Sequence, residues 1–320
     1  MHQVEAVSLD DLVPSTHSYR QFSSLWSFEG VNQRLQKLEK DNAYKGYGLL
    51  RLFKCLLLQF LEDTSDRELQ RFLQENTAAK WFCGFGLAEK TPDYSVFSKL
   101  RKRIGTKVLS AIFADLREQL KAQGVMNEVF SFVDATHLIS KAALWQERDK
   151  AIKAKYDKLN NEVLPKVAVD KQARIGCKGK KKYWYGYKQH TSVDMQSGLI
   201  NKVGITPANE TDAKGLKHVC PTQGAIYADK GYCTKHAKRA AAHRDCHLAA
   251  IQKNNMKGKN KEKDRWFSHL RSPYERVFSK RNKRVRYRGV AKNQFSAFMY
   301  AISFNLKRLA VLDPPNLALI

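Results

Sequence analysis

The spacing of apolar residues changes once along this chain, near residue 126, and this change limits the folds that the chain can adopt. Before that point, apolar residues such as Leu49, Leu52 and Leu56 recur at three- and four-residue intervals, which places them on one face of a helix. After it, short apolar runs and alternating segments predominate, and both are typical of strands. The sequence therefore predicts two domains, an all-helical domain at 1–125 and a mixed α/β domain at 126–320.

The helical part also contains two helix-start signals. Ser65 followed by Glu68 has the form of a capping box, in which each side chain bonds to the backbone N–H of the other residue. Thr91 followed by Pro92 predicts a further start, because proline is favoured at the first position of a helix. The helix expected after Pro92 combines an apolar side with several lysines and arginines, so it is a candidate for docking against DNA.

The second part contains the elements of a mixed sheet. The order strand, two antiparallel strands, strand, helix, strand, helix is that of a ribonuclease-H-like domain, a mixed sheet flanked by helices. Ser197-Gly198 supplies the turn between the two antiparallel strands. The expected strands are 130–133, 183–193, 199–205, 225–228 and 247–251, and the expected helices are 144–159, 235–243, one from about 273, and 293–309.

Three acidic residues occur in settings that suggest a shared site. Asp134 ends the apolar run in SFVDATHL, Asp229 ends the one in AIYADKGY, and Glu275 lies in the basic, amphipathic segment RSPYERVF. The first and fourth strands end side by side in the expected topology, so the two aspartates should be neighbours although they are 95 positions apart. Two such aspartates and a helix-borne glutamate can hold two divalent cations roughly 3.5–4 Å apart, which clamp the attacking and leaving oxygens of a phosphoryl transfer.

The ligand set consists of carboxylate oxygens, so the expected cofactor is a pair of Mg²⁺ or Mn²⁺ ions. Each acid also has an ordinary structural explanation. Asp134 and Asp229 could cap turns, and Glu275 could pair with Arg271, which lies four residues earlier on the same helical face. The site therefore depends on the three acids meeting in space.

The net positive charge indicates the class of partner. The chain has 57 lysines and arginines against 31 acids, a net charge of +26, which predicts salt-sensitive attraction to polyanions. Between Lys253 and Lys292 there are 15 basic residues and three acids, so the segment around Glu275 could bind the DNA backbone, although a charge run can also be a solvated face. The residues expected to contact DNA are Arg271, Lys280, Arg281, Arg284, Lys230, Lys181, Lys99 and Arg101.

Other features argue against a membrane or secreted protein. The most apolar stretch, 49–61, contains Arg51 and Lys54 and is too short to span a bilayer. The first residues lack the basic and apolar segments of a secretory leader. The six cysteines form no C-x-x-C pair and are expected to be reduced thiols. The expected location is the cytoplasm, with association to the nucleoid through DNA.

Several motifs in this order resemble the DDE transposases of bacterial insertion sequences, most closely the insertion-sequence family-five group. The helical part carries SDRELQRFL, WFCGFGL and TPDYSVFSKLRKRIG, and the second part carries FVDATHL, YGYKQHTSVD, TPANETDAK, YADKGY and RSPYERVFSKRNK. The two catalytic aspartates of that family correspond to Asp134 and Asp229, and its glutamate corresponds to Glu275. Related families share a signature of Tyr, Arg, Glu and Lys. Arg271 and Glu275 match that signature, whereas Ser268 and Asn282 stand at its Tyr and Lys positions.

The resemblance implies a transposase that cuts double-stranded DNA at the ends of an insertion sequence and joins the freed 3′ hydroxyl to target DNA. It also implies two-metal phosphoryl transfer, recognition of the DNA ends by the helical domain, and a homodimer in the synaptic complex. Two alternatives remain open from the sequence. One is a metal-dependent nuclease on the same fold that cuts without joining, and the other is a non-catalytic DNA-binding repressor derived from a transposase.

Overall fold

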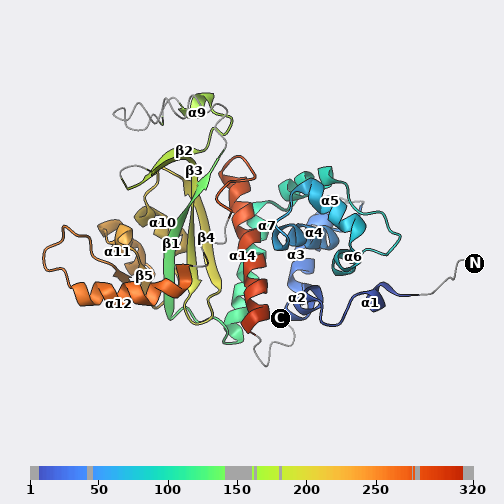
Figure 1. Ribbon diagram of the computed structural model, residues 1–320, viewed down its shortest axis with the longest axis horizontal. Coiled ribbons are helices and arrows are strands. Elements are labelled where there is room, and N and C mark those ends of the chain that lie inside the picture. The colour runs from blue at the N-terminus through green and yellow to red at the C-terminus, as the bar shows by residue number, and fades with distance from the viewer. Residues whose placement is uncertain are drawn as a thin grey trace, which may run out of the picture. The chain divides into compact units, whose positions relative to one another are not determined.

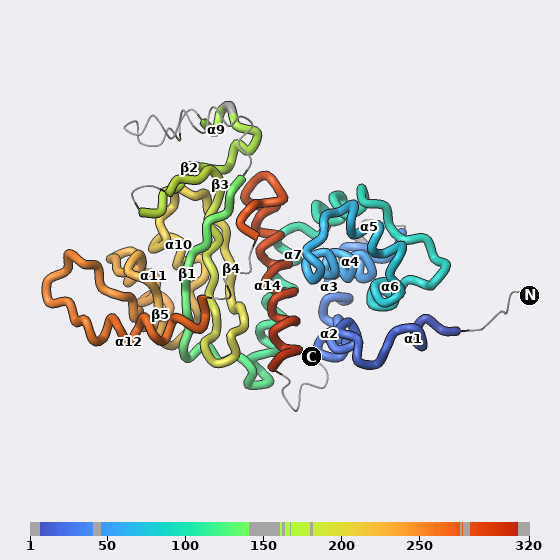
Figure 2. Tube along the Cα trace, in the orientation of Figure 1, coloured from blue at the N-terminus to red at the C-terminus, as the bar shows by residue number. Residues whose placement is uncertain are grey.

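The computed structural model describes residues 7–41, 46–140, 161, 164–179, 182–275, 277 and 282–312, and its contacts divide the chain into two compact units (Figures 1 and 2). The first unit comprises Met1–Gln123 together with Phe298–Ile320, and the second comprises Gly124–Ala297. The contacts therefore assign the start of the last helix to the second unit and its later part to the first.

The first unit is helical, as predicted. The apolar spacing that predicts its central helix has the expected effect, because Leu49, Leu52 and Leu56 are all at most 1% exposed. No helix in the described ranges is long and apolar enough to cross a membrane. The helices of this unit are α1 (Leu9–Leu12), α2 (Ser18–Leu25), α3 (Glu29–Asp41), α4 (Leu49–Leu61), α5 (Asp66–Glu75), α6 (Thr77–Cys83) and α7 (Tyr94–Ala122), joined by the later part of α14 (Val290–Leu312).

One of the two predicted helix starts is confirmed and the other is shifted. Ser65 and Glu68 form the predicted capping box at the start of α5, with both reciprocal hydrogen bonds present. The prediction that Thr91 caps the next helix is wrong by two residues, because Asp93 accepts a hydrogen bond from the backbone N–H of Ser95 and α7 begins at Tyr94. α7 therefore begins after Asp93, whose side chain caps the first turn of the helix.

A six-stranded mixed sheet forms the second unit and has the ribonuclease-H-like topology predicted from the order of the elements. Its strands follow one another as β2-β3-β1-β5-β6, and β4 also pairs with β3. β1 (Phe130–Ile139) runs antiparallel to β3 (Lys182–Asp194) and parallel to β5 (Ala225–Ala228). The other strands are β2 (Arg174–Lys178) and β4 (Ile200–Pro207), both antiparallel to β3, and β6 (His247–Ala250), parallel to β5.

Helices pack against this sheet and enclose its core. α10 (Asp212–Val219) and α11 (Lys235–Ala242) enclose a core that includes Val133, Ile226 and Tyr232, all fully buried. α12 (Lys261–Arg271) contacts β5, beside which it lies in Figure 1. The remaining elements are α9 (Leu164–Val167) and the 3₁₀ turns η2 (Lys230–Tyr232) and η3 (Ser272–Tyr274).

Several predicted elements differ from the structure near the site. β1 does not end at Asp134 but continues to Ile139, because residues 134–139 pair with β3. The helix predicted from about Pro273 begins slightly later: α12 ends at Arg271, η3 spans Ser272–Tyr274, and Glu275 and Val277 are again α-helical. β2 and α10 are additional to the predicted elements. The predicted helix at 144–159 lies outside the described residues.

Candidate functional site

The strand register brings Asp134 and Asp229 together. β1 and β5 pair in parallel, and their last pair is Val133 with Ala228, so the two aspartates are the next residues on adjacent strands. Asp134 itself pairs with Thr191 of β3, because β1 continues beyond the point where β5 ends. The predicted adjacency of the two aspartates is confirmed.

Asp134 has the more strongly perturbed carboxyl group. Burial raises the pKa of Asp134 from 3.8 to about 6, whereas the backbone N–H of Ala135 and the cations Arg271 and Lys178 act in the opposite direction. The nearby acid Asp212 raises this pKa further. A carboxyl group that is partly protonated near neutral pH needs a nearby cation in order to carry its full charge.

Asp229 and Glu275 share a contact with one arginine. The Nη1 atom of Arg271 lies 3.4 Å from Oδ1 of Asp229, and its Nη2 atom lies 3.8 Å from Oε1 of Glu275. The arginine side chain is 9% exposed, whereas those of Asp229 and Glu275 are 47% and 63% exposed. The ion pair that offered an alternative explanation for Glu275 is therefore present, but the same guanidinium also contacts Asp229.

The elements around Arg271 explain its position. It is the last residue of α12, a helix capped by Asn260, and its guanidinium carbon lies 5.3 Å from the centre of the Phe132 ring on β1. Because side chains two residues apart on a strand share a face, Phe132 and Asp134 present their side chains to the same side of the sheet. Arg271 thus connects α12 to the face of β1 that carries Asp134.

A cavity of about 590 Å³ opens beside these residues. It combines acids with exposed cations, so it is suited to a polyanion that approaches a cation-binding site. Ser268, at the signature's tyrosine position, lines the cavity and donates a hydrogen bond to the Asp264 carbonyl at 2.9 Å. The lining residues are Asp229, Lys230, Ile251, Gln252, Asn254, Lys259, Lys261, Asp264, Arg265, Ser268, Arg271 and Glu275.

The structure adds two residues, Asp212 and Tyr232, that the sequence prediction did not include. Asp212, the first residue of α10, accepts a hydrogen bond from Nζ of Lys188 at 2.8 Å. Tyr232 is fully buried, and its hydroxyl has no hydrogen-bond partner within the described part of the chain. Burial raises the pKa of Tyr232, and the charges of Asp134, Asp212 and Asp229 raise it further. The motif TPANETDAK, which contains Asp212, was the available sequence signal.

The donor chemistry of the acids fits a hard divalent cation. Asp134, Asp229 and Glu275 offer only carboxylate oxygens, the donors that Mg²⁺ and Mn²⁺ prefer. Across the described ranges, no three carboxylate, histidine or cysteine side chains are grouped closely enough to hold an ion as they stand. Arg271 contacts two of the three acids, so its guanidinium supplies positive charge where a cation would bind.

The residues predicted to contact DNA fall into three groups. Lys230 and Lys99 are exposed, and each lines a cavity. Arg284 is also exposed and lies beside the end of β1, where the backbone N–H of Val285 donates a hydrogen bond to the Ile139 carbonyl at 2.9 Å. The other two described arginines contact acids: Arg271 is buried beside Asp229, and Arg101 is paired with Asp66. Lys181, Lys280 and Arg281 lie outside the described residues.

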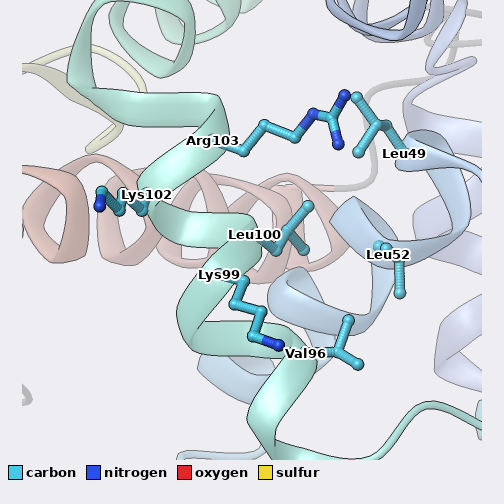
Figure 3. A pocket seen from close by; sticks show the side chains of 7 residues that line it. All are labelled: Leu49, Leu52, Val96, Lys99, Leu100, Lys102 and Arg103. Atoms are coloured by element: carbon cyan, nitrogen blue, oxygen red, sulfur yellow. The ribbon is translucent and has the colours of Figure 1, made fainter. Parts of the chain in front are cut away.

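The cavity that contains Lys99 belongs to the helical unit. It measures about 680 Å³, and leucines of α4 and α7 form its apolar wall (Figure 3). Figure 3 shows the Arg103 side chain extending from α7 towards Leu49, while Lys102 points away from that leucine. The full lining is Leu49, Leu52, Val96, Lys99, Leu100, Lys102 and Arg103.

Comparisons with known proteins agree with the order of the motifs. Residues 7–103 match a family described as "Transposase domain (DUF772)", and residues 132–306 match one described as "Transposase DDE domain". No curated protein matches the chain in sequence. Among solved structures, it is similar to the "Mos1 transposase paired-end complex with left transposon end" at 9% identity, over 78% of this chain and 77% of that chain, with a TM-score of 0.18. The family assignment therefore depends on the sequence matches, and the insertion-sequence family-five group stays a prediction.

Proposed function

Since the chain belongs to the DDE transposase family, which matches residues 132–306, we propose that Asp134, Asp229 and Glu275 are the acids that carry its reaction. Enzymes of this family cleave DNA and transfer the cleaved strands, so the chain is a DNA transposase. The parallel register of β1 and β5 is the observation that carries the proposal, because it makes two acids neighbours at one edge of a ribonuclease-H-like sheet.

The family depends on divalent metal, and the proposed ions are two Mg²⁺ or Mn²⁺ held by the three acids. When bound, they would stabilise the attacking and leaving oxygens of an in-line phosphoryl displacement. Asp134 must lose its proton before it can act as a ligand, and its raised pKa of about 6 makes that proton available near neutral pH. Asp229 and Glu275 are more exposed and would complete the oxygen-rich edge of the cavity.

Exposed cations around the same cavity would position the DNA backbone. Lys230, Lys261 and Arg265 are exposed and line it together with Asp229 and Glu275, so phosphates bound by them would lie next to the reacting group. Arg284 would extend this contact with the DNA backbone. The remaining proposed contacts, predicted from the sequence, are Lys181, Lys280 and Arg281. Such contacts orient a duplex without distinguishing its bases.

The helical unit is the proposed reader of the element ends. Lys99 and Lys102 are exposed on α7, near an apolar cavity, and can bind phosphates while neighbouring residues of the unit contact bases. We further propose a homodimer, which would hold two element ends during strand transfer. Action on cellular DNA also leads us to propose the cytoplasm and the nucleoid as its location.

The test is Mg²⁺-dependent cleavage and joining by the purified protein on the flanking DNA of its own element. Wild-type protein should produce joined products, and Asp229→Asn should produce neither cleaved nor joined DNA. Asp245→Asn changes the same functional group at an exposed position after α11 and should behave as wild type. Cleavage without joining by the wild type would support the nuclease alternative, and salt-sensitive binding without cleavage would support the repressor.

A further inference from the structure

Arg271 is a buried cation that contacts two of the proposed metal ligands. Its distances to Asp229 and Glu275 are 3.4 and 3.8 Å, longer than the roughly 2.7–2.9 Å of a strong charge-assisted hydrogen bond. Its Nε atom has no hydrogen-bond partner within the described residues. The arginine therefore neutralises both acids without tightly occupying their oxygens.

The protein holds the guanidinium in place mainly through its aromatic neighbour and its helix. Phe132 lies beneath it at 5.3 Å, and the ring of Tyr274 lies 6.3 Å from that of Phe132. Tyr274 directly precedes Glu275 and donates a hydrogen bond from its hydroxyl to the Met195 carbonyl. The same aromatic pair therefore positions Arg271 and anchors the segment that carries Glu275.

Three carboxylates at one edge of a sheet repel one another, and a nearby positive charge reduces that repulsion. A guanidinium and a divalent cation are alternative sources of this charge, and both require oxygens of Asp229 and Glu275. We infer that Arg271 is a positioning residue that keeps Asp229 and Glu275 together in the metal-free protein and competes with divalent cations for them. This inference rests on the proposed function, because it takes those two acids to be metal ligands.

Competition predicts a direction of change that a purely structural role does not. If Arg271 only supported the fold, Arg271→Met would disorder the acids and weaken binding of Mn²⁺. If it competes, the variant loses the rival cation and should bind Mn²⁺ about fivefold more tightly. Cleavage should nevertheless fall about tenfold or more, because Glu275 loses the contact that positions it.

The experiment measures the Mn²⁺ dissociation constant of the full chain by electron paramagnetic resonance at 0.15 M salt. Arg265→Met is the matched control, since Arg265 lies on α12, lines the same cavity, is exposed and has the same charge. It should change the dissociation constant less than twofold, because an exposed charge is screened at this ionic strength. Unchanged or weaker Mn²⁺ binding by Arg271→Met would overturn the inference.

Two further variants keep the result interpretable. Arg271→Lys retains the positive charge but cannot bridge both acids, so it should bind Mn²⁺ with an affinity between wild type and Arg271→Met and recover part of the cleavage. If Arg271→Met does not fold, the affinity of Arg271→Lys decides, and wild-type affinity would overturn the inference. Asp229→Asn distinguishes failure of the proposed metal site from failure of the competition. If Asp229→Asn binds Mn²⁺ as tightly as wild type, the proposed site is wrong. If Asp229→Asn loses Mn²⁺ binding but Arg271→Met binds Mn²⁺ with wild-type affinity, only the competition is contradicted.

Discussion

Arg101 in the helical unit and Arg271 in the sheet unit are both largely buried beside an aspartate, yet their ion pairs differ in kind. Arg101 donates to both carboxylate oxygens of Asp66, at 2.9 and 2.5 Å. Arg271 contacts Asp229 at 3.4 Å and is shared with the more exposed Glu275 at 3.8 Å. A tight bidentate pair stabilises one geometry, whereas a loose, shared pair beside a cavity leaves carboxylate oxygens available to another cation.

The comparison also explains why basic residues in similar sequence settings have different roles. Arg101 and Arg271 both lie in strongly basic segments, and the sequence predicts DNA contact for both. Each arginine instead faces an acid that comes from elsewhere in the chain: Asp66 is 35 positions from Arg101, and Asp229 is 42 positions from Arg271. A high density of basic residues in the sequence indicates a DNA-binding surface. Which of those basic side chains are free to contact DNA depends on whether an acid from elsewhere in the chain pairs with them.

The largest effect on cleavage should come from replacing Glu275, the more exposed of the two acids that Arg271 contacts. Glu275→Gln should lower cleavage at least a hundredfold, because it removes a charged ligand oxygen, an effect expected to exceed the roughly 10–100-fold cost of losing a residue that only orients a ligand. Single-turnover cleavage of element-end DNA measures this. Glu262→Gln, an exposed glutamate near the start of α12, should retain wild-type cleavage, and equal losses in both variants would contradict the assignment.

The next effect is a difference in the free energy of unfolding between variants of Arg101 and Arg271. Arg101→Met should lower the free energy of unfolding by about 2 kcal/mol, because it leaves Asp66 unpaired in a partly buried position. Arg271→Met should lower it by less than about 1 kcal/mol in metal-free protein, since its contacts are long and its acids are exposed. Urea denaturation with a chelator compares them, and an equal loss in both variants would remove the distinction.

Asp134 gives a smaller, pH-dependent effect on stability. Its pKa in the folded protein, about 6, lies above its ordinary value of 3.8, so its favourable contribution is complete below about pH 4 and is lost as the pH rises past 6. Metal-free protein should therefore lose roughly 1–2 kcal/mol of stability between pH 4.5 and 7.5 from this group. Asp134→Asn should be more stable than wild type at pH 7.5 and should lack this part of the pH dependence. An unchanged pH dependence in the variant would show that Asp134 titrates normally.

The smallest effect concerns DNA binding. Lys230→Ala and Arg284→Ala should each reduce the slope of log affinity against log salt concentration by about 1, because each removes one phosphate contact. Arg271→Met should leave that slope unchanged, since its guanidinium is buried against acids. Fluorescence anisotropy with labelled DNA at several salt concentrations provides the measurement. A reduced slope in Arg271→Met would restore the sequence prediction of a direct DNA contact.

The sequence predicts the features of the fold that depend on local pattern. The apolar run Ala225–Ala228 matches β5 residue for residue, and the spacing in α4 identifies its buried face. The topology then makes Asp134 and Asp229 neighbours, because parallel strands that pair end at a common edge. The order of the motifs also predicted the function, and both family matches agree with it.

The features that could not be predicted depend on contacts between distant segments. The second half of β1, from Asp134 to Ile139, pairs with β3, although the apolar run that predicted the strand ends at Val133. Asp212 joins the surroundings of the site because α10 begins there, packed against η2. The loose pairing of Arg271 depends on side-chain distances that a sequence does not contain.

The central claim, that Asp134, Asp229 and Glu275 bind the cations of the reaction, is tested most directly by locating those cations. We would crystallise the full chain with Mn²⁺ and measure anomalous diffraction at the manganese absorption edge. If the three acids hold the cations, anomalous peaks should lie within bonding distance of Asp134 and Asp229, with Glu275 next to them and Arg271 moved away from these acids. Peaks at other residues, with the Arg271 contacts to Asp229 and Glu275 retained, would contradict it.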